Sequence, residues 1–113
     1  MRIVRNSIDL KDLREMSSAT FGSLVKAVVD VERDLLALDS ELHSDLEHIL
    51  IEDGSRQPDL WGINLYPELP ESEFIEFDSL INIRPWQGNR SRDVENPDIR
   101  EKIVQTVARK VRR

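Results

Sequence analysis

The chain has 113 residues, of which 39% are hydrophobic and 34% charged, so it is long enough for one domain with one core and too short for a two-domain enzyme. It has no cysteine, which excludes disulfide bonds, thiolate nucleophiles and cysteine-ligated metal centres. The net charge of −6 disfavours non-specific binding to nucleic acid or to an anionic membrane, so we expect a single domain over residues 1–113 without such partners.

The first predicted elements are a short strand, a helix and a hairpin. Residues 3 and 4 are Ile and Val, which favour a strand. Ser7 then offers an N-cap, and the apolar residues after it recur at helical spacing. Residues 24–31 and 35–38 are rich in β-branched and aliphatic side chains and predict two paired strands. We expect the second strand to continue through residues 39–43.

The middle of the chain predicts a second helix and a second hairpin. Ser44 and Glu47 match the S-x-x-E capping box, which predicts a helix that begins at Ser44 and ends near Gly54. Apolar and polar residues alternate over 61–66 and again over 74–84. Because side chains in a strand point alternately to opposite faces, each segment is predicted to be a strand with one polar face.

The last predicted element is a helix capped by Asn96, with Pro97 at its first position. Its apolar stripe consists of Ile99, Ile103, Val107 and Val111. The predicted order is therefore β-α-β-β-α-β-β-α. Each hairpin has an apolar face to cover, so we expect an α+β two-layer sandwich, with a largely antiparallel sheet and three helices on one face.

One candidate site lies where the first hairpin leads into the second helix. Glu41 and His43 project from the same face of an extended strand, and Asp45 follows at the helix start. Carboxylates and imidazoles are ligands of divalent metals, so these residues, with Asp30 across the hairpin, predict a metal-assisted, hydrolase-like enzyme as one alternative function. The prediction requires the helix to begin at Ser44, because residues two apart diverge on a helix. The alternative is a solvated edge in which His43 only forms a hydrogen bond near the helix start.

A second candidate site is the polar face of the later hairpin together with the loop that follows it. Amide, phenol and guanidinium groups are expected to converge there, and an arginine can hold a carboxylate or a phosphate through two parallel hydrogen bonds. The predicted ligand-binding residues are Asn64, Tyr66, Asn82, Arg84, Asn89 and Arg90. The alternative is that this face is simply in contact with water, as one face of an antiparallel sheet often is.

The uneven distribution of charge supports an anionic ligand. Residues 1–83 carry 7 basic and 18 acidic side chains, whereas residues 84–113 carry 9 basic and 4 acidic ones. The leading hypothesis is therefore a binding module for an anionic small molecule or an acidic partner segment. A third hypothesis is a homodimer or a regulatory interaction domain that uses an exposed strand edge. The two differently charged parts of the chain are also explained if they neutralise each other on folding.

Neither a membrane nor the secretory pathway is indicated by the sequence. No segment approaches the roughly 20 apolar residues of a spanning helix, and the first residues lack the apolar stretch of a signal peptide. We therefore expect a cytoplasmic protein.

Several segments resemble a known family. They are GSLVKAVVD at residues 22–30, ELHSD at 41–45, EDGSRQPDLWGINLYP at 52–67, SLINIRP at 79–85 and NRS at 89–91. They are similar to segments of a family of small, uncharacterised bacterial and archaeal proteins, over nearly the whole chain. The resemblance implies a single-domain prokaryotic protein of unknown function, and it transfers no activity, cofactor or site residue to this chain.

Overall fold

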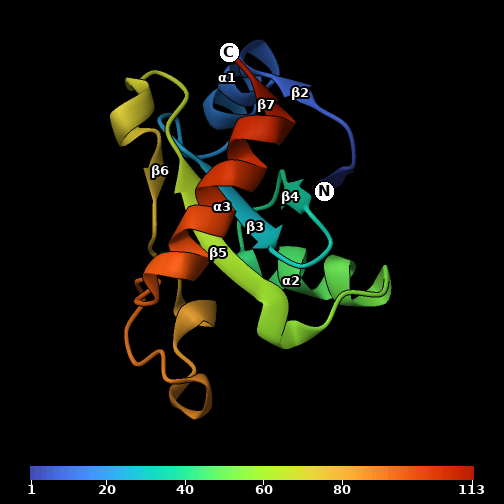
Figure 1. Cartoon of the computed structure of the whole chain (residues 1–113). Helices are drawn as coiled ribbons and strands as arrows, with labels where there is room; N and C mark the ends of the chain where they lie inside the picture. The colour runs from blue at the N-terminus through green and yellow to red at the C-terminus, as the bar shows by residue number, and fades with distance from the viewer.

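A five-stranded antiparallel sheet forms the centre of the molecule in the computed structural model, which describes residues 1–113 (Figure 1). Its strand order is β1-β4-β3-β5-β6. The strands are β1 (Arg2–Val4), β3 (Val25–Asp30), β4 (Leu35–Leu38), β5 (Leu60–Leu65) and β6 (Ile75–Glu76). A second sheet pairs β2 (Ile8–Asp9) with β7 (Val111–Arg112) in parallel, which joins segments about a hundred residues apart in the sequence.

Three α-helices and four short 3₁₀ helices complete the fold. The α-helices are α1 (Leu10–Ala19), α2 (His43–Glu52) and α3 (Pro97–Lys110). The 3₁₀ helices are η1 (Gln57–Asp59), η2 (Glu71–Glu73), η3 (Leu80–Asn82) and η4 (Pro85–Gln87). None of these helices combines the length and the apolar composition required to cross a lipid bilayer. The predicted α+β class, the antiparallel sheet and the three helices are thus confirmed.

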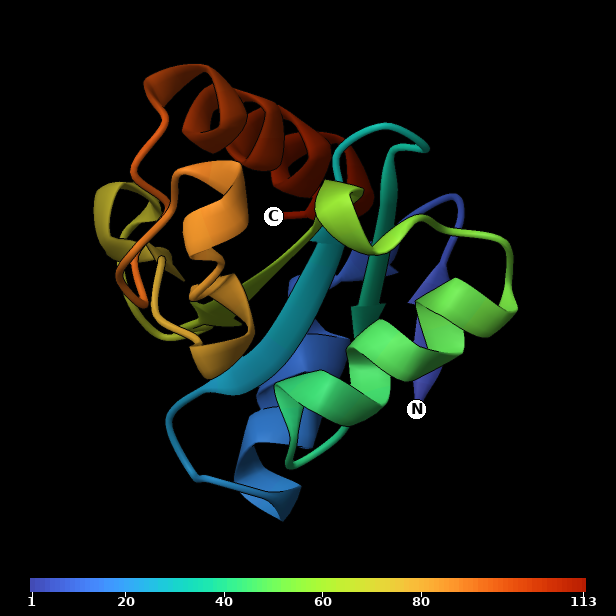
Figure 2. The same ribbon diagram turned by 90° about the horizontal axis from the view of Figure 1, so that it is seen from below.

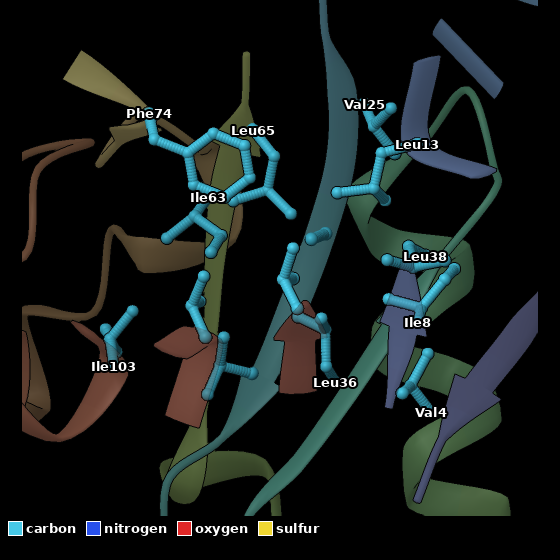
Figure 3. Packing of buried hydrophobic residues seen from close by; sticks show 14 of the residues in the cluster. Val4, Ile8, Leu13, Val25, Leu36, Leu38, Ile63, Leu65, Phe74 and Ile103 are labelled. Atoms are coloured by element: carbon cyan, nitrogen blue, oxygen red, sulfur yellow. The ribbon is translucent and has the colours of Figure 1, made fainter. Parts of the chain in front are cut away.

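The larger core lies on one face of the sheet, beneath α1 and α3. Ala27 and Val29 of β3 point into this core, whereas Val28, between them, points to the opposite face. Leu13 of α1 and Ile103 of α3 pack against the sheet residues of the larger core (Figure 3). The two helices therefore cover one face together.

The smaller core lies on the opposite face, beneath α2. Leu46 and Leu50 of α2 pack with Val28 and Ala37 of the sheet, and α2 and α3 lie on opposite sides of β3 (Figure 2). The expectation that all three helices lie on one face is therefore wrong. The physical reason is that every residue of β4 and β5 is buried, so both faces of the central strands require a cover.

The second predicted hairpin forms only in part. Of the segment 74–84, only the two residues of β6 pair with β5, and the chain then enters η3 and η4. A side chain takes the place of the missing strand. Asn82 Oδ1 accepts a hydrogen bond from the Gly62 amide at 2.8 Å, and Asn82 Nδ2 donates to the Gly62 carbonyl at 2.9 Å. The alternating pattern of residues 74–84 therefore reflects long-range side-chain contacts rather than a continuous strand.

Two of the three predicted helix starts are displaced by tertiary contacts. The helix expected after Ser7 begins at Leu10, with Asp9 as its N-cap, because Ile8 and Asp9 pair with β7. The helix expected to begin at Ser44 begins at His43, and no capping hydrogen bond forms from a side chain. The start of α3 agrees with the prediction, since Asn96 Oδ1 accepts hydrogen bonds from the two amides at positions 98 and 99.

Candidate functional site

The largest cavity of the molecule, with a volume of about 590 Å³, lies on the same face of the sheet as α2. Its lining comes from β3, β5, β6, the start of α2 and the segment that contains η3. Both polar and apolar side chains line it, and we call it the Lys26 pocket, after the lysine in its wall. The lining consists of Phe21, Leu24, Lys26, Leu42, His43, Ser44, Asn64, Tyr66, Glu76, Asp78, Ser79, Leu80, Ile81 and Arg92. A cavity of this size is in the range that holds small organic ligands.

Strand register places the central polar residues of the pocket in one row. Lys26 of β3 pairs with Asn64 of β5, and Asn64 pairs in turn with Glu76 of β6. Residues that are paired in this way lie on the same face of a sheet. Tyr66 lies two residues beyond Asn64 and therefore faces the same side. Three adjacent strands thus present a cation, an amide and a carboxylate in order.

Glu76 is held in place by two hydrogen bonds. Asn64 Nδ2 donates to Glu76 Oε1 at 2.8 Å, and the Tyr66 hydroxyl donates to the same oxygen at 2.9 Å. Burial, together with the neighbouring Glu76 carboxylate, raises the pKa of Tyr66, so the phenol remains a donor at neutral pH. The second carboxylate oxygen of Glu76, Oε2, accepts no hydrogen bond from the protein. It is therefore free to accept one from a ligand.

Lys26 is the cation in the pocket that lacks an acidic partner. Its side chain is half-buried, and its ammonium lies 5.2 Å from the centroid of the Phe21 ring. No carboxylate oxygen lies within 4.0 Å of Lys26 Nζ. Arg92, the other cation of the lining, is already paired, since its Nε lies 2.5 Å from an oxygen of Asp78. Lys26 is thus the charge that remains available to an anion.

His43 contributes an acceptor with a fixed orientation. It is buried at the start of α2, and its Nε2 lies 2.7 Å from the carbonyl oxygen of Ile63. Because a carbonyl oxygen only accepts, Nε2 carries the proton and Nδ1 is the acceptor of the neutral ring. Burial lowers the pKa of His43 below its ordinary value, and this effect outweighs the opposing hydrogen bond to Ile63. The ring is therefore neutral at pH 7, and its Nδ1 makes no hydrogen bond within the protein.

The lowered pKa of His43 predicts that folding stability falls below neutral pH. The unfolded chain takes up a proton near pH 6.5, whereas the folded chain does so only at lower pH. The stabilisation that the neutral His43 ring provides is fully present above about pH 6.5 and declines as the pH falls below this value. Urea unfolding between pH 5 and pH 7.5 measures the slope of the free energy of unfolding against pH. A His43→Gln variant should lose most of this slope.

His48 supplies the matched control for this experiment. It is the second of the two histidines and is exposed, with Nε2 2.9 Å from Glu52 Oε1. A His48→Gln variant should keep the slope of the original protein. The carboxylates act in a lower pH range, because the stabilisation from Asp34 and Asp53, whose pKa is lowered from 3.8, and from Glu95, whose pKa is lowered from 4.5, is lost mainly below pH 5. An equal slope in the original protein and in His43→Gln would contradict the assignment of a neutral buried ring.

The structure places the six predicted ligand-binding residues in three different settings. Asn64 and Tyr66 line the Lys26 pocket. Asn82, Arg84 and Asn89 are buried and bind main-chain groups of the protein itself. The sixth predicted residue, Arg90, is exposed, and only its main-chain amide is engaged, with Glu95. These groups do not converge because the segment from η3 to η4 leaves the sheet rather than continuing it as a strand.

Arg84 is the clearest example of a predicted ligand-binding residue that binds the main chain of the protein itself. Its Nη1 donates to the Gln57 carbonyl and its Nη2 to the Leu60 carbonyl, each at 2.7 Å. The guanidinium lies over the Trp61 ring, 4.1 Å from its centroid. Burial lowers the pKa of Arg84, yet an arginine remains charged at physiological pH. The guanidinium therefore binds two carbonyl groups of the protein, whereas the sequence predicted that it would bind an external anion.

The predicted metal-binding residues are not brought together. The main chain at Asp39 has a positive φ of 74°, which ends β4 and prevents Glu41 and His43 from sharing the face of a strand. His43 turns into the fold, whereas Glu41 and Asp45 are exposed. Asp30 is buried and accepts a hydrogen bond from the Ser55 hydroxyl at 2.6 Å. No three histidine or acidic side chains of the chain are grouped so that they could share a metal ion.

Sequence reasoning missed Lys26 and Glu76, the two charged ends of the row in the pocket. One signal for Lys26 was present, since it interrupts the apolar run of residues 24–31. Glu76 carried no such signal, because acidic residues are frequent on the polar side of any strand. Their proximity depends on which residues of β3, β5 and β6 are paired, and this register is a long-range property.

Comparison with known proteins adds a family and no relative of known activity. A family model described as a protein of unknown function (DUF5674) matches residues 2–110. No curated protein and no solved structure matches the chain. The geometry of the pocket is therefore the basis for inferring a function.

Proposed function

Since the chain belongs to DUF5674, a family of proteins of unknown function, we propose its function from the pocket: it is a binding module for a small organic anion held by Lys26. The family match also confirms the resemblance to uncharacterised proteins seen in the sequence segments. The observation that carries the proposal is a half-buried lysine without an acidic partner, in the wall of a cavity of about 590 Å³. Charge attraction is stronger in such a partly desolvated site than in water.

The lining favours a singly charged organic acid over phosphate. Glu76 faces the same cavity as Lys26 and has no cationic partner, whereas Asp78 is paired with Arg92, so the Glu76 carboxylate repels a second negative charge on a ligand. Leu24, Leu42 and Leu80 provide apolar surface for a hydrocarbon part of the ligand. A small carboxylate with an aliphatic portion satisfies both conditions. The metal-assisted alternative lacks comparable support, because its predicted ligands do not converge.

Replacing Lys26 by glutamine tests the proposal. The probes are small aliphatic carboxylates, with and without amino or hydroxy substituents, added singly in thermal unfolding experiments. Binding to the folded state at a hundredfold excess over Kd stabilises it by about 2.7 kcal/mol, which raises Tm by several degrees. Every probe that raises the Tm of the original protein should lose most of this effect with Lys26→Gln.

Lys102 provides the matched control, because it is exposed on α3 and lies outside the pocket. A Lys102→Gln variant should respond to the probes as the original protein does. The unliganded Tm of Lys26→Gln should change little, because Lys26 forms no ion pair. A panel without any response, or a response that Lys26→Gln retains, would contradict the proposed function.

A further inference from the structure

We infer that the ligand of the Lys26 pocket is an amino acid with an aliphatic side chain, whose carboxylate binds Lys26 and whose ammonium binds Glu76. This inference rests on the proposed function and specifies its ligand class. The two charged residues lie on the same face of the sheet, two strands apart, with Asn64 between them. They do not neutralise each other, since no ion pair joins them within 4.0 Å. A ligand with both charges fits between them.

The balance of unused hydrogen-bonding groups favours a ligand rich in donors. Lys26 supplies the one free cation of the lining, whereas Glu76 Oε2 and His43 Nδ1 are acceptors that no protein group occupies. An anion without a donor satisfies Lys26 alone and makes no hydrogen bond to either acceptor. An ammonium group carries three donors and also compensates the negative charge of Glu76. The acceptors therefore point to a cationic group beside the carboxylate.

Asn64 provides an independent observation in the same row. The residue is 6% exposed, and its Oδ1 is buried without any hydrogen-bond partner. Its amide nitrogen is committed to Glu76, so the side chain cannot rotate to exchange the two atoms without breaking that bond. A buried acceptor without a donor destabilises the unliganded protein. Oδ1 has almost no exposed surface, so a ligand donor removes this penalty only by moving the Asn64 side chain toward the cavity.

The remainder of the lining selects the side chain of the amino acid. Leu24, Leu42 and Leu80 border the polar row, and Leu80 and Leu42 are exposed in the unliganded protein at 67% and 54%. Contact with an aliphatic side chain removes this surface from water. The expected ligand is thus a leucine-like amino acid.

Three probes with one carbon skeleton separate the contributions. Isothermal titration of the full chain uses L-leucine, α-hydroxyisocaproate and isocaproate, which carry an ammonium group, a hydroxyl group and neither, respectively. We expect L-leucine to bind at least about tenfold more tightly than isocaproate, the effect of one charge-assisted hydrogen bond. A Glu76→Gln variant should lose this advantage and bind isocaproate as well as or better than the original protein does.

Glu73, exposed in η2 outside the pocket, supplies the control, and Glu73→Gln should bind all probes like the original protein. If isocaproate binds as tightly as L-leucine, the ligand class is wrong while the proposed function stands. Equal binding of L-leucine and α-hydroxyisocaproate would show that a neutral donor suffices and would overturn the ammonium assignment. If none of the three probes binds, the inference fails; silence across the wider panel of carboxylates would overturn the proposed function as well.

Discussion

An Arg84→Met variant is expected to unfold with a free energy about 2–4 kcal/mol lower than that of the original protein. Arg84 is 1% exposed and donates to the carbonyls of Gln57 and Leu60. Methionine fills part of the space and avoids burying a charge, but it leaves both carbonyls without donors. It also removes the contact of the guanidinium with the Trp61 ring. For a chain of this length, Tm should fall by about 10–20 °C.

The Arg84→Met variant distinguishes a ligand-binding role of Arg84 from a structural one. If Arg84 faced an external anion, its loss would abolish binding and leave Tm unchanged. If it connects β5 to η1 and η4, its loss lowers Tm. Urea unfolding and circular dichroism measure the change, and Arg90→Met, at an exposed position in the same segment, should remain within about 0.5 kcal/mol of the original protein. An Arg84→Met variant of unchanged stability would contradict the structural role.

A Gly62→Ala variant is expected to lose about 3 kcal/mol of stability through overpacking. A β-carbon on Gly62 would lie 2.5 Å from both Cβ and Oγ of Ser79 and 3.1 Å from Cγ1 of Ile81. Ser79 cannot rotate its own β-carbon away, so β5 and the chain before η3 must separate. That movement also strains the two hydrogen bonds between Asn82 and Gly62. Chemical unfolding of the purified variant measures the loss.

A second substitution, at Ser79, tests whether the clash with the new β-carbon causes the loss of stability. Ser79→Gly removes both atoms that clash most closely, so Gly62→Ala in that background should cost at least about 1 kcal/mol less than in the original protein. Gly22→Ala serves as the control for a new methyl group without neighbours, since nothing lies within 4 Å of its β-carbon position. Its positive φ of 88° alone should cost about 1–2 kcal/mol. Strict additivity of the two changes at Gly62 and Ser79 would show that the clash does not cause the loss.

The predictions succeeded where local sequence determines local structure. Asn96 and Pro97 define the start of α3 because a capping side chain and a fixed φ act within one turn. The hairpin of β3 and β4 follows from two β-branched, aliphatic runs separated by a short turn. Such signals need no knowledge of the remainder of the fold.

Prediction failed where distant segments decide the outcome. The alternation over residues 74–84 is typical of a strand, yet Asn82 and Arg84 bind main-chain groups that lie 20 and 24 residues away in the sequence. His43 begins α2 one residue earlier than the capping box suggests, in a position where its ring reaches Ile63. In the candidate site, Asn64 and Tyr66 were found because they share the polar face of one strand. Lys26 required the register between two strands, which no local pattern encodes.

The side chains that bind the main chain of β5 also cover the free edge of this strand. The β6 strand pairs with only two residues of β5, so the remainder of the apolar segment LWGINL would otherwise present free main-chain groups to another molecule. Asn82 occupies the amide and carbonyl of Gly62, and Arg84 occupies the carbonyl of Leu60. These groups can no longer template a strand from a second chain. The folded chain therefore shields from aggregation a sequence that, when exposed, has the composition of a β-forming segment.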